Sequence, residues 1–312
     1  MRALPLIAVL LFATSAWAHP GVGIVEDSKG NVFYTDLKQV WRIAPDGTKS
    51  VAVPDVHTHE LCLDAEDTLY GEHLWYEGDA TKKWGHRVWS RTREGVIRDV
   101  IPAREGFLDD YSFVRDGTGT MYWADRGATT VIRKRAPGGA IGVHSTGPFR
   151  DVRWMTASAD GIVYLVDGTR LVKIQPDGKA ATLLASVTKK ALGASEHFQG
   201  GLWTGPGGSV YVAVPEDRVV LEVKPDGSTR VAARSPMLWA AYGGMIDRRG
   251  NLWLLETSIV NAVRVRRIGK DGKEETVAWR NRRPRRPAPP WTSSSAASPT
   301  RAAGRTARPS SS

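Results

Sequence analysis

The sequence predicts an all-β protein, a six-bladed β-propeller of four-stranded antiparallel blades, over residues 19–279 of the 312-residue chain. The first observation is a repeat of one aromatic residue after a short polar turn. Successive copies are 37, 52, 42, 47 and 42 residues apart, on average 44, which is the length of one four-stranded blade. The six aromatics are Phe33, Tyr70, Tyr122, Tyr164, Tyr211 and Trp253.

The second observation is a set of turns that repeats in step with the aromatics. Three residues before each aromatic stands glycine, or Asp67 in the second copy, as tight turns require. Further along each copy lies a second turn, which predicts the hairpin between the third and fourth strands. These turns are Ile43–Gly47, Thr92–Gly95, Arg135–Gly139, Ile174–Gly178, Val223–Gly227 and Ile268–Gly272.

The first copy, residues 23–53, shows how one unit is built. Polar breaks at residues 27–31, 36–38 and 45–47 separate short runs rich in Val, Ile, Phe, Tyr and Trp, the pattern of a four-stranded meander. A single meander cannot bury both of its apolar faces, whereas a closed ring of blades buries them and protects the sheet edges. An open β-sandwich is the alternative, and six copies at a nearly constant period favour the ring.

The repeats also resemble a known family. The units GIVEDSKGNVFYTD…VWRIAPDG and GMIDRRGNLWLLE are similar to NHL repeats and to the six-bladed propellers of the SMP-30/gluconolactonase-like and TolB-like group. The resemblance covers residues 21–279. It implies the propeller fold, which serves both enzymes and binding scaffolds.

Both ends of the chain differ in composition from the repeats. Residues 1–18 predict a signal peptide, with Arg2, an apolar stretch at 4–13 that is too short to span a membrane, and Ala-Trp-Ala before the cleavage point. We therefore expect a secreted or periplasmic protein. Residues 280–312 contain eight Arg and no acidic residue, and their Pro, Ser and Ala content predicts a disordered tail, whether a functional polyanion-binding segment, a linker or a frameshift-like artefact.

Charge and cysteine content exclude several classes. The tail supplies eight of the ten net positive charges and Arg2 one more, so the propeller is near +1. We therefore expect no nucleic-acid partner for the propeller, no membrane span after signal cleavage, and a monomer. The single cysteine, Cys62, is interpreted as a small buried apolar residue.

One face of the ring gathers the chemically active side chains. In a propeller, the loop entering each blade and the loop joining its second and third strands project from the same face, which we call the loop face. Six of the seven histidines fall in these loops, and His144 leads into one. A concave, aromatic mouth with converging polar groups predicts a binding site for a small molecule, peptide or protein. The candidate ligand-binding residues are His73, Trp75, Trp84, His86, Tyr111, Arg153, Trp154, His197, Trp239 and Tyr242.

The second copy has the strongest metal signal. His57 and His59 are two apart on extended backbone and point the same way, so they are candidate ligands of one divalent ion, Ca²⁺, Zn²⁺ or Mn²⁺, with Glu60, His73 or His86 completing the site. The loop that follows, residues 71–87, is expected to be the longest joining loop. Local hydrogen bonding of these histidines is the alternative, in which case no cofactor is expected.

The family resemblance supplies an enzymatic alternative. Lactonase members hold one divalent cation over the central channel with Glu, Asn and Asp from different blades, and the cation polarises an ester carbonyl and activates water. The resemblance implies Glu60 as a catalytic candidate, with Asp110 (or its neighbour Asp109) and Asp151 as further oxygen ligands. The expected asparagine is not matched, because the suitable Asn261 lies in the sixth copy.

Two hypotheses therefore stand. In the first, the protein is a binding module that uses its His- and aromatic-rich loop face. In the second, it is a metal-dependent hydrolase, lactonase- or esterase-like, or a lyase. The sequence contains no G-x-S-x-G, H-E-x-x-H, phosphate-loop or paired-cysteine motif.

Overall fold

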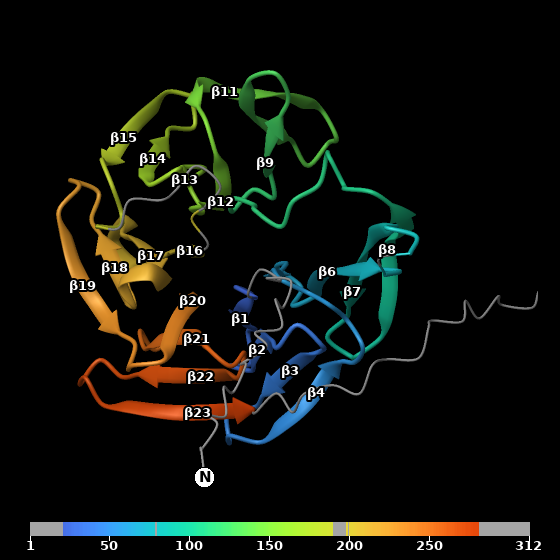
Figure 1. Ribbon diagram of the computed structural model, residues 1–312, viewed down its shortest axis with the longest axis vertical. Coiled ribbons are helices and arrows are strands. Elements are labelled where there is room, and N and C mark those ends of the chain that lie inside the picture. Colours follow the sequence, from blue (N-terminus) through green and yellow to red (C-terminus); the bar gives the residue numbers. More distant parts are fainter. Residues whose placement is uncertain (1–20, 79, 190–197, 199, 281–312) are drawn as a thin grey trace, which may run out of the picture.

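Six antiparallel sheets form a closed ring around a central axis (Figure 1). The computed structural model describes residues 21–78, 80–189, 198 and 200–280. The predicted signal peptide, the predicted tail beyond residue 280 and His197 lie outside these residues. Within the described part, no helix is long and apolar enough to cross a membrane. The predicted fold class is confirmed.

Blades 1 and 2 are four-stranded meanders. Blade 1 consists of β1 (Ile24–Glu26), β2 (Val32–Thr35), β3 (Val40–Ile43) and β4 (Lys49–Val53). Blade 2 consists of β5 (Leu61–Leu63), β6 (Leu69–Tyr76), β7 (Trp84–Arg91) and β8 (Ile97–Glu105).

Blade 3 has a reduced inner edge. Its sheet contains β9 (Met121–Arg126), β10 (Thr130–Arg135) and β11 (Ile141–Phe149). The segment that leads to the channel replaces an innermost strand with one bridge, Arg115 to Met121, and a hydrogen bond from the Tyr122 N–H to Val114 O (3.0 Å).

Blades 4 to 6 are again four-stranded. Blade 4 consists of β12 (Val152–Ala157), β13 (Val163–Asp167), β14 (Arg170–Ile174) and β15 (Ala180–Leu184). Blade 5 consists of β16 (Leu202–Thr204), β17 (Val210–Val214), β18 (Val219–Val223) and β19 (Thr229–Arg234). Blade 6 consists of β20 (Trp239–Ile246), β21 (Leu252–Ser258), β22 (Val263–Ile268) and β23 (Glu274–Arg280).

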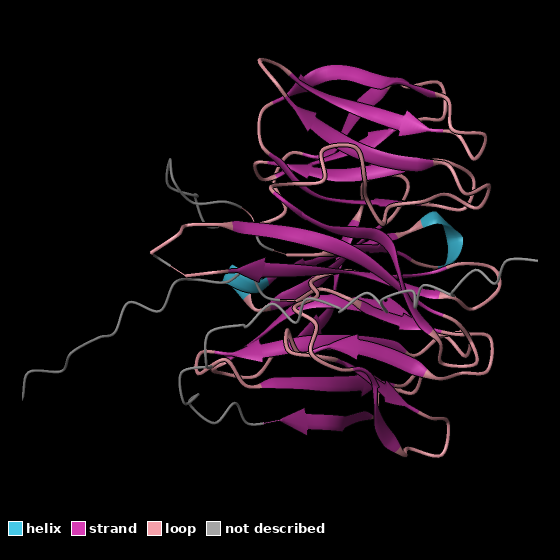
Figure 2. Ribbon diagram, turned by 90° about the vertical axis from the view of Figure 1, so that its right-hand side faces the viewer, coloured by secondary structure: helices cyan, strands magenta, loops and turns pink. Residues whose placement is uncertain are grey.

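The connections lie on two opposite faces of the ring (Figure 2). The loop face carries the entering and joining loops. The opposite face, which we call the turn face, carries the turns between first and second strands and between third and fourth strands. Two 3-10 turns of blade 5 lie on opposite faces, η1 (Pro206–Gly208) on the turn face and η2 (Pro215–Asp217) on the loop face.

The core lies between blades, where facing sheets interlock apolar side chains. Buried clusters join blades 1 and 2, 3 and 4, 4 and 5, and 5 and 6. Blade 6 packs against blade 1 through another cluster. The two blades share no strand, because each sheet is built from four consecutive strands. Among the described residues, no comparable cluster joins blades 2 and 3. Members of the closing cluster include Ile24, Tyr34, Trp253, Leu255 and Val265.

Candidate functional site

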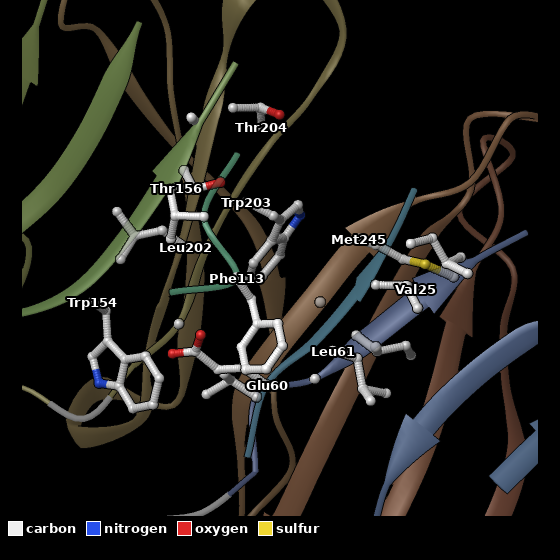
Figure 3. Close-up of a pocket in the computed structure, with 18 of the residues that line it drawn as sticks. Val25, Glu60, Leu61, Phe113, Trp154, Thr156, Leu202, Trp203, Thr204 and Met245 are labelled. Atoms are coloured by element: carbon white, nitrogen blue, oxygen red, sulfur yellow. The ribbon is translucent and has the colours of Figure 1, made fainter. Parts of the chain in front are cut away.

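The central channel contains a cavity with a volume of about 490 Å³. One stretch from the inner edge of every blade lines it. Most of the lining side chains are apolar, among them Leu61, Phe113, Trp203 and Met245 (Figure 3). The stretches are residues 22–26, 60–61 with 63, 113–115, 154–157, 201–204, and 244–246 with 248.

Glu60 is the acidic group on the inner edge of blade 2, directly before β5. Its backbone is fixed, because the carbonyl of the preceding residue, His59, accepts the N–H groups of Val22 and Gly23 at 2.9 and 2.8 Å. Its carboxyl group lies in the channel between Trp154 and Phe113 (Figure 3). Glu60 is thus a carboxyl group with apolar rings around it.

This environment shifts the titration of Glu60. Burial beside apolar groups raises its pKa to about 7, and the negative charge of Glu72 acts in the same direction. The charges of His59 and Arg126 oppose the shift. At neutral pH, Glu60 is therefore divided between its acid and its carboxylate forms.

Glu72 is a site residue that the sequence did not indicate. It lies on β6, and its Oε1 accepts the backbone N–H of His59 and, at 3.3 Å, that of Glu60. The same oxygen lies 3.4 Å from His59 Nδ1. Its Oε2 is buried without a hydrogen-bond partner in the described structure. Glu72 therefore holds the His59–Glu60 segment at the channel and places a second negative charge beside it.

Three of the predicted histidines meet on blade 2. The rings of His57 and His59 are in edge contact, with centroids 4.8 Å apart. The Nδ1 of His73 accepts the N–H of His57 at 2.9 Å, so this nitrogen is already used in a local hydrogen bond. Burial, and after it the charge of Arg87, lowers the pKa of His73, which favours the neutral ring.

The metal candidates do not form a complete ligand set. Within the described residues, no group of three or more His, Cys, Asp and Glu side chains is placed to hold a metal ion. His57, His59 and Glu60 do not make such a group, because Glu60 turns into the channel and His59 pairs with Glu72. The predicted three-ligand arrangement therefore does not fit the geometry of blade 2.

The two other catalytic candidates lie in ion pairs. Asp110 is exposed and bonds Arg135 at 2.7 Å, with Arg104 at 3.9 Å. Asp151 pairs with Arg153 at 2.6 Å, so that predicted ligand-binding arginine is likewise engaged. Glu60, Asp110 and Asp151 are therefore not brought together as one oxygen-ligand site.

The expected long loop of blade 2 is mostly strand. Instead of a loop over residues 71–87, β6 and β7 extend through this region as a hairpin, with Leu74 opposite His86 and Trp75 opposite Gly85. Neighbouring side chains on a strand point to opposite faces, so His73 and Trp75 face blade 1, whereas Trp84 and His86 face blade 3. The loop-face side chains of this hairpin are thus divided between the junction with blade 1 and the junction with blade 3.

The blade 3 side of this hairpin forms an aromatic cluster. Phe107 contacts both Trp84 and His86, with centroids 4.0 and 5.6 Å away. Burial lowers the pKa of His86, and its Nδ1 has no partner in the described structure. Tyr111 lies in the same junction, against Phe113 and beneath Arg115.

The remaining ligand-binding candidates are dispersed. Trp154 lines the channel. Trp239 packs beneath the guanidinium group of Arg264, 4.1 Å from its ring centroid, and the backbone oxygen of Tyr242 accepts the Gly201 N–H. His197 is outside the described residues. Of the predicted positions that the structure describes, Glu60 and Trp154 line the channel.

The channel residues that the sequence did not indicate share a recognisable position. Phe113, Leu202, Trp203 and Met245 belong to the first segment of their repeats, immediately before the first turn. The innermost segment of each blade lines the axis of a propeller. The repeat alignment therefore contains the signal, which lies in the strands next to the axis and not in the loops.

Comparison with known proteins supports the architecture alone. No family model matches the sequence, and no curated protein matches it. A streptogramin B lyase structure aligns with a TM-score of 0.53 and 12% identity, over 83% of this chain and 82% of that chain. A putative gluconolactonase aligns with a TM-score of 0.51 and 13% identity, over 75% and 84%.

A gluconolactonase from Xanthomonas campestris aligns with a TM-score of 0.50 and 13% identity, over 76% of this chain and 83% of that chain. At such low identity, the alignments report how the chain folds and leave its chemistry open. The chain therefore has the six-bladed β-propeller fold of the gluconolactonase-like propellers and streptogramin B lyase, which confirms the predicted resemblance at the level of the fold.

Proposed function

We propose that the protein is a binding module that holds a small molecule at the loop-face end of the central channel. The observation that carries this proposal is the carboxyl group of Glu60, which lies between the rings of Trp154 and Phe113 in a channel cavity of about 490 Å³. Binding sites for small molecules combine such an apolar wall with a few placed polar groups. The cavity is large enough for a ligand of one or two rings.

The chemistry of the wall indicates the type of ligand. Trp154 and Phe113 flank Glu60 and offer ring faces to an apolar body (Figure 3). A protonated amine on that body would pair with the Glu60 carboxylate and interact favourably with the rings. We therefore propose an aromatic or alicyclic amine as the ligand class.

An isosteric series tests this proposal. Benzylamine, benzyl alcohol and benzoate are titrated calorimetrically against the protein at pH 7.5. We expect benzylamine to bind about tenfold more tightly than benzoate, because one charged hydrogen bond is worth about 1.5–3 kcal/mol. Glu60→Gln should remove this preference, whereas Glu77→Gln, at the exposed tip of the blade 2 hairpin, should retain it. If the Glu60→Gln variant still preferred benzylamine over benzoate as strongly as the native protein does, the proposal would be contradicted.

A second candidate function rests on the titration of the same residue. A carboxyl group with a pKa of about 7 is suited to act as a general base or acid near neutral pH. This favours the hydrolase or lyase alternative, with Glu60 moving the proton. The streptogramin B lyase and gluconolactonase structures have the same fold.

Two assays separate this alternative from simple binding. Glucono-1,5-lactone hydrolysis and ring opening of a streptogramin B antibiotic are measured with and without added Ca²⁺, Zn²⁺ or Mn²⁺. An enzyme of this kind should turn over one substrate, with a rate that follows the titration of Glu60 and disappears in Glu60→Gln. If neither substrate is turned over under any condition, the enzyme alternative is excluded and the binding function stands.

We also propose that the protein acts outside the cytoplasm. The proposal is supported by the sequence of residues 1–18. N-terminal sequencing of the exported protein should give His19 as the first residue. Retention of Met1 in the cytoplasmic fraction would overturn it.

A further inference from the structure

A second cavity opens on the turn face, between blades 1 and 2. Its volume is about 360 Å³, and four of its nine lining residues carry a positive charge. The two blades lie side by side in the ring (Figure 1). This cavity is separate from the channel, because the two share no lining residue. The lining consists of Asp27, Lys29, Asn31, Phe33, Arg42, Pro45, Asp67, Arg91 and Arg93.

Two arginines reach into the cavity from facing sheets. Arg42 on β3 lies opposite Phe33 in register, on the side of blade 1 that packs against blade 2. Arg91 on β7 stacks over the Phe33 ring, with its guanidinium carbon 6.0 Å from the centroid. Its Nε donates to Ala52 O at 3.2 Å, across the blade junction. The two guanidinium groups are thus brought from different blades into one pocket.

These arginines have no carboxylate partner among the described residues. Arg91 bonds only backbone carbonyl oxygens, those of Ala52 and Thr92. The Nε of Arg42 is buried and donates to no acceptor in the described structure. Burial, and after it the positive charge of Arg42, lowers the pKa of Arg91, whereas Asp27 acts the other way. Like charges therefore face each other in a partly desolvated space.

The two carboxylates of the pocket already accept hydrogen bonds from turn residues. Asp27 accepts the N–H groups of Lys29 and Asn31 and the side-chain amide of Asn31. Asp67 accepts both the N–H and the hydroxyl group of Ser28, and Arg93 approaches it only to 4.0 Å. The lining thus carries four cations and two engaged carboxylates, while Asp46, near Arg42, and Glu94, near Arg93 and Lys29, lie outside it.

We propose that this pocket binds a phosphate-type oxyanion, held between the guanidinium groups of Arg42 and Arg91. The planar fork of arginine matches the oxygens of phosphate and sulfate, and an anion would turn the repulsion between the two groups into attraction. Lys29 is exposed and Arg93 is 47% exposed in its side chain, so both lie at the rim where an anion would enter. The free volume also admits the organic part of a phosphate monoester.

Thermal unfolding in the presence of anions tests the site. The native protein is melted at constant ionic strength in chloride with increasing inorganic phosphate, sulfate or glycerol 3-phosphate. A ligand that binds only the folded state raises the melting temperature with its concentration. We expect phosphate to raise it, and Arg42→Gln to weaken the apparent affinity about tenfold or more, because charged hydrogen bonds are lost. Glycerol 3-phosphate binding more tightly than phosphate would identify a monoester as the natural form.

Two further variants make the result decisive. Arg249→Gln removes one exposed arginine from the same face and should leave the phosphate effect unchanged. Arg42→Lys keeps the charge but loses the fork, so it should weaken phosphate binding less than Arg42→Gln does. The proposal is overturned if matched chloride gives the same stabilisation as phosphate. It is also overturned if Arg42→Gln and Arg42→Lys both respond to phosphate as the native protein does.

Discussion

Glu60 shows how a channel of apolar side chains determines the behaviour of one residue. Water solvates a carboxylate far better than rings and aliphatic groups do, so the surroundings of Glu60 favour its protonated form. Glu72, which anchors the same segment through its Oε1, adds a repelling charge. Both effects raise the pKa, and Arg126, which is bound to the Val152 carbonyl, only partly compensates.

The raised pKa has a direct consequence for stability. A group whose pKa is higher in the folded than in the unfolded state contributes stability below its unfolded pKa and loses it as the pH rises through the folded value. For Glu60 this window runs from 4.5 to about 7. Ionisation above pH 7 should cost on the order of 2 kcal/mol, because each unit of pKa shift corresponds to 1.36 kcal/mol and Glu60 is only partly buried.

The free energy of unfolding of Glu60→Gln, relative to that of the native protein, should therefore differ between pH 5 and pH 8. The variant should gain stability relative to the native protein between pH 5 and pH 8, since its amide does not ionise. Urea unfolding at both pH values measures the difference, with Glu77→Gln as the exposed control. A stability difference that is the same at pH 5 and pH 8 would show that Glu60 titrates normally.

At this scale, the sequence predicts single residues better than it predicts their combinations. Glu60 and Trp154 are predicted site residues and both line the channel. Glu72 escapes prediction because its role depends on a pairing between β5 and β6 that brings it under the His59–Glu60 segment. Asp110 resembles Glu60 in sequence because both precede an inner segment, but the path of residues 106–112 carries it to Arg135 instead.

At the level of elements, an aspartate fixes the spacing between the first turn and the aromatic in blades 2, 3 and 6, whereas blades 4 and 5 carry Ser158 and Gly205 at the same position. Six residues before the aromatic of the second strand, this aspartate accepts backbone N–H groups of the turn through Oδ1. Its Oδ2 accepts the polar hydrogen of the aromatic, from Tyr70 to Asp64, from Tyr122 to Asp116 and from Trp253 to Asp247. The turn between these residues needs a positive φ three positions before the aromatic, met by glycine in five blades and by Asp67 (φ 63°) in blade 2.

Removing this aspartate should unfold a blade more readily than removing an exposed one. Asp247 is 7% exposed and accepts bonds from Asn251 N, Asn251 Nδ2 and Trp253 Nε1 at 2.7 to 2.8 Å. Asp247→Ala leaves these donors unpaired, and we expect a loss of about 2–4 kcal/mol. Chemical denaturation measures it, with Asp226→Ala in the exposed hairpin of blade 5 as control. An equal loss in both variants would argue against the bridging role of Asp247.

The elongated hairpin of blade 2 marks the limit of prediction at this scale. Its tip region, rich in Gly, Lys, Asp and Thr, resembles a loop, and the histidines and tryptophans beside it show no clear alternation of polar and apolar residues. The strands form because eight residue pairs of β6 and β7 join in register, from Leu69–Arg91 to Tyr76–Trp84. This pairing is a property of two segments together, which a local pattern cannot display.

In the whole molecule, closure of the ring can be predicted from the repeat. Which junctions between blades are filled by buried apolar side chains cannot. The period and the two registers of turns are sufficient to predict six blades in the observed order. Five junctions are filled by buried apolar clusters. The junction of blades 2 and 3 instead holds Trp84, His86 and Phe107 in ring contact, with Tyr111 beneath Arg115, and blade 3 has only a bridge at its inner edge.

The junction between blades 2 and 3, which lacks a buried apolar cluster in the described structure, should be the first part of the ring to open. Local openings range from almost no cost to the full free energy of unfolding, and junctions with few buried apolar contacts lie at the low end. Cys62 is the protein's single thiol, and its neighbours on β5, Leu61 and Leu63, pack toward blade 1. Alternation along the strand directs Cys62 toward blade 3, where the charge of Arg115 reaches it.

Thiol labelling at pH 8 can therefore report on this junction. Cys62 is partly exposed in the folded protein, and sub-global opening exposes it further, so it should react with a disulfide reagent at least about tenfold faster than a cysteine placed in a filled junction. The comparison is Cys62→Ala combined with Val172→Cys, whose position is 3% exposed in the cluster of blades 3 and 4. Burial raises the pKa of the Cys62 thiol, so its labelling should accelerate further above pH 8. Equal rates at the two positions, both tracking global unfolding in urea, would show that the junction of blades 2 and 3 opens together with the filled junctions and is no weaker than they are.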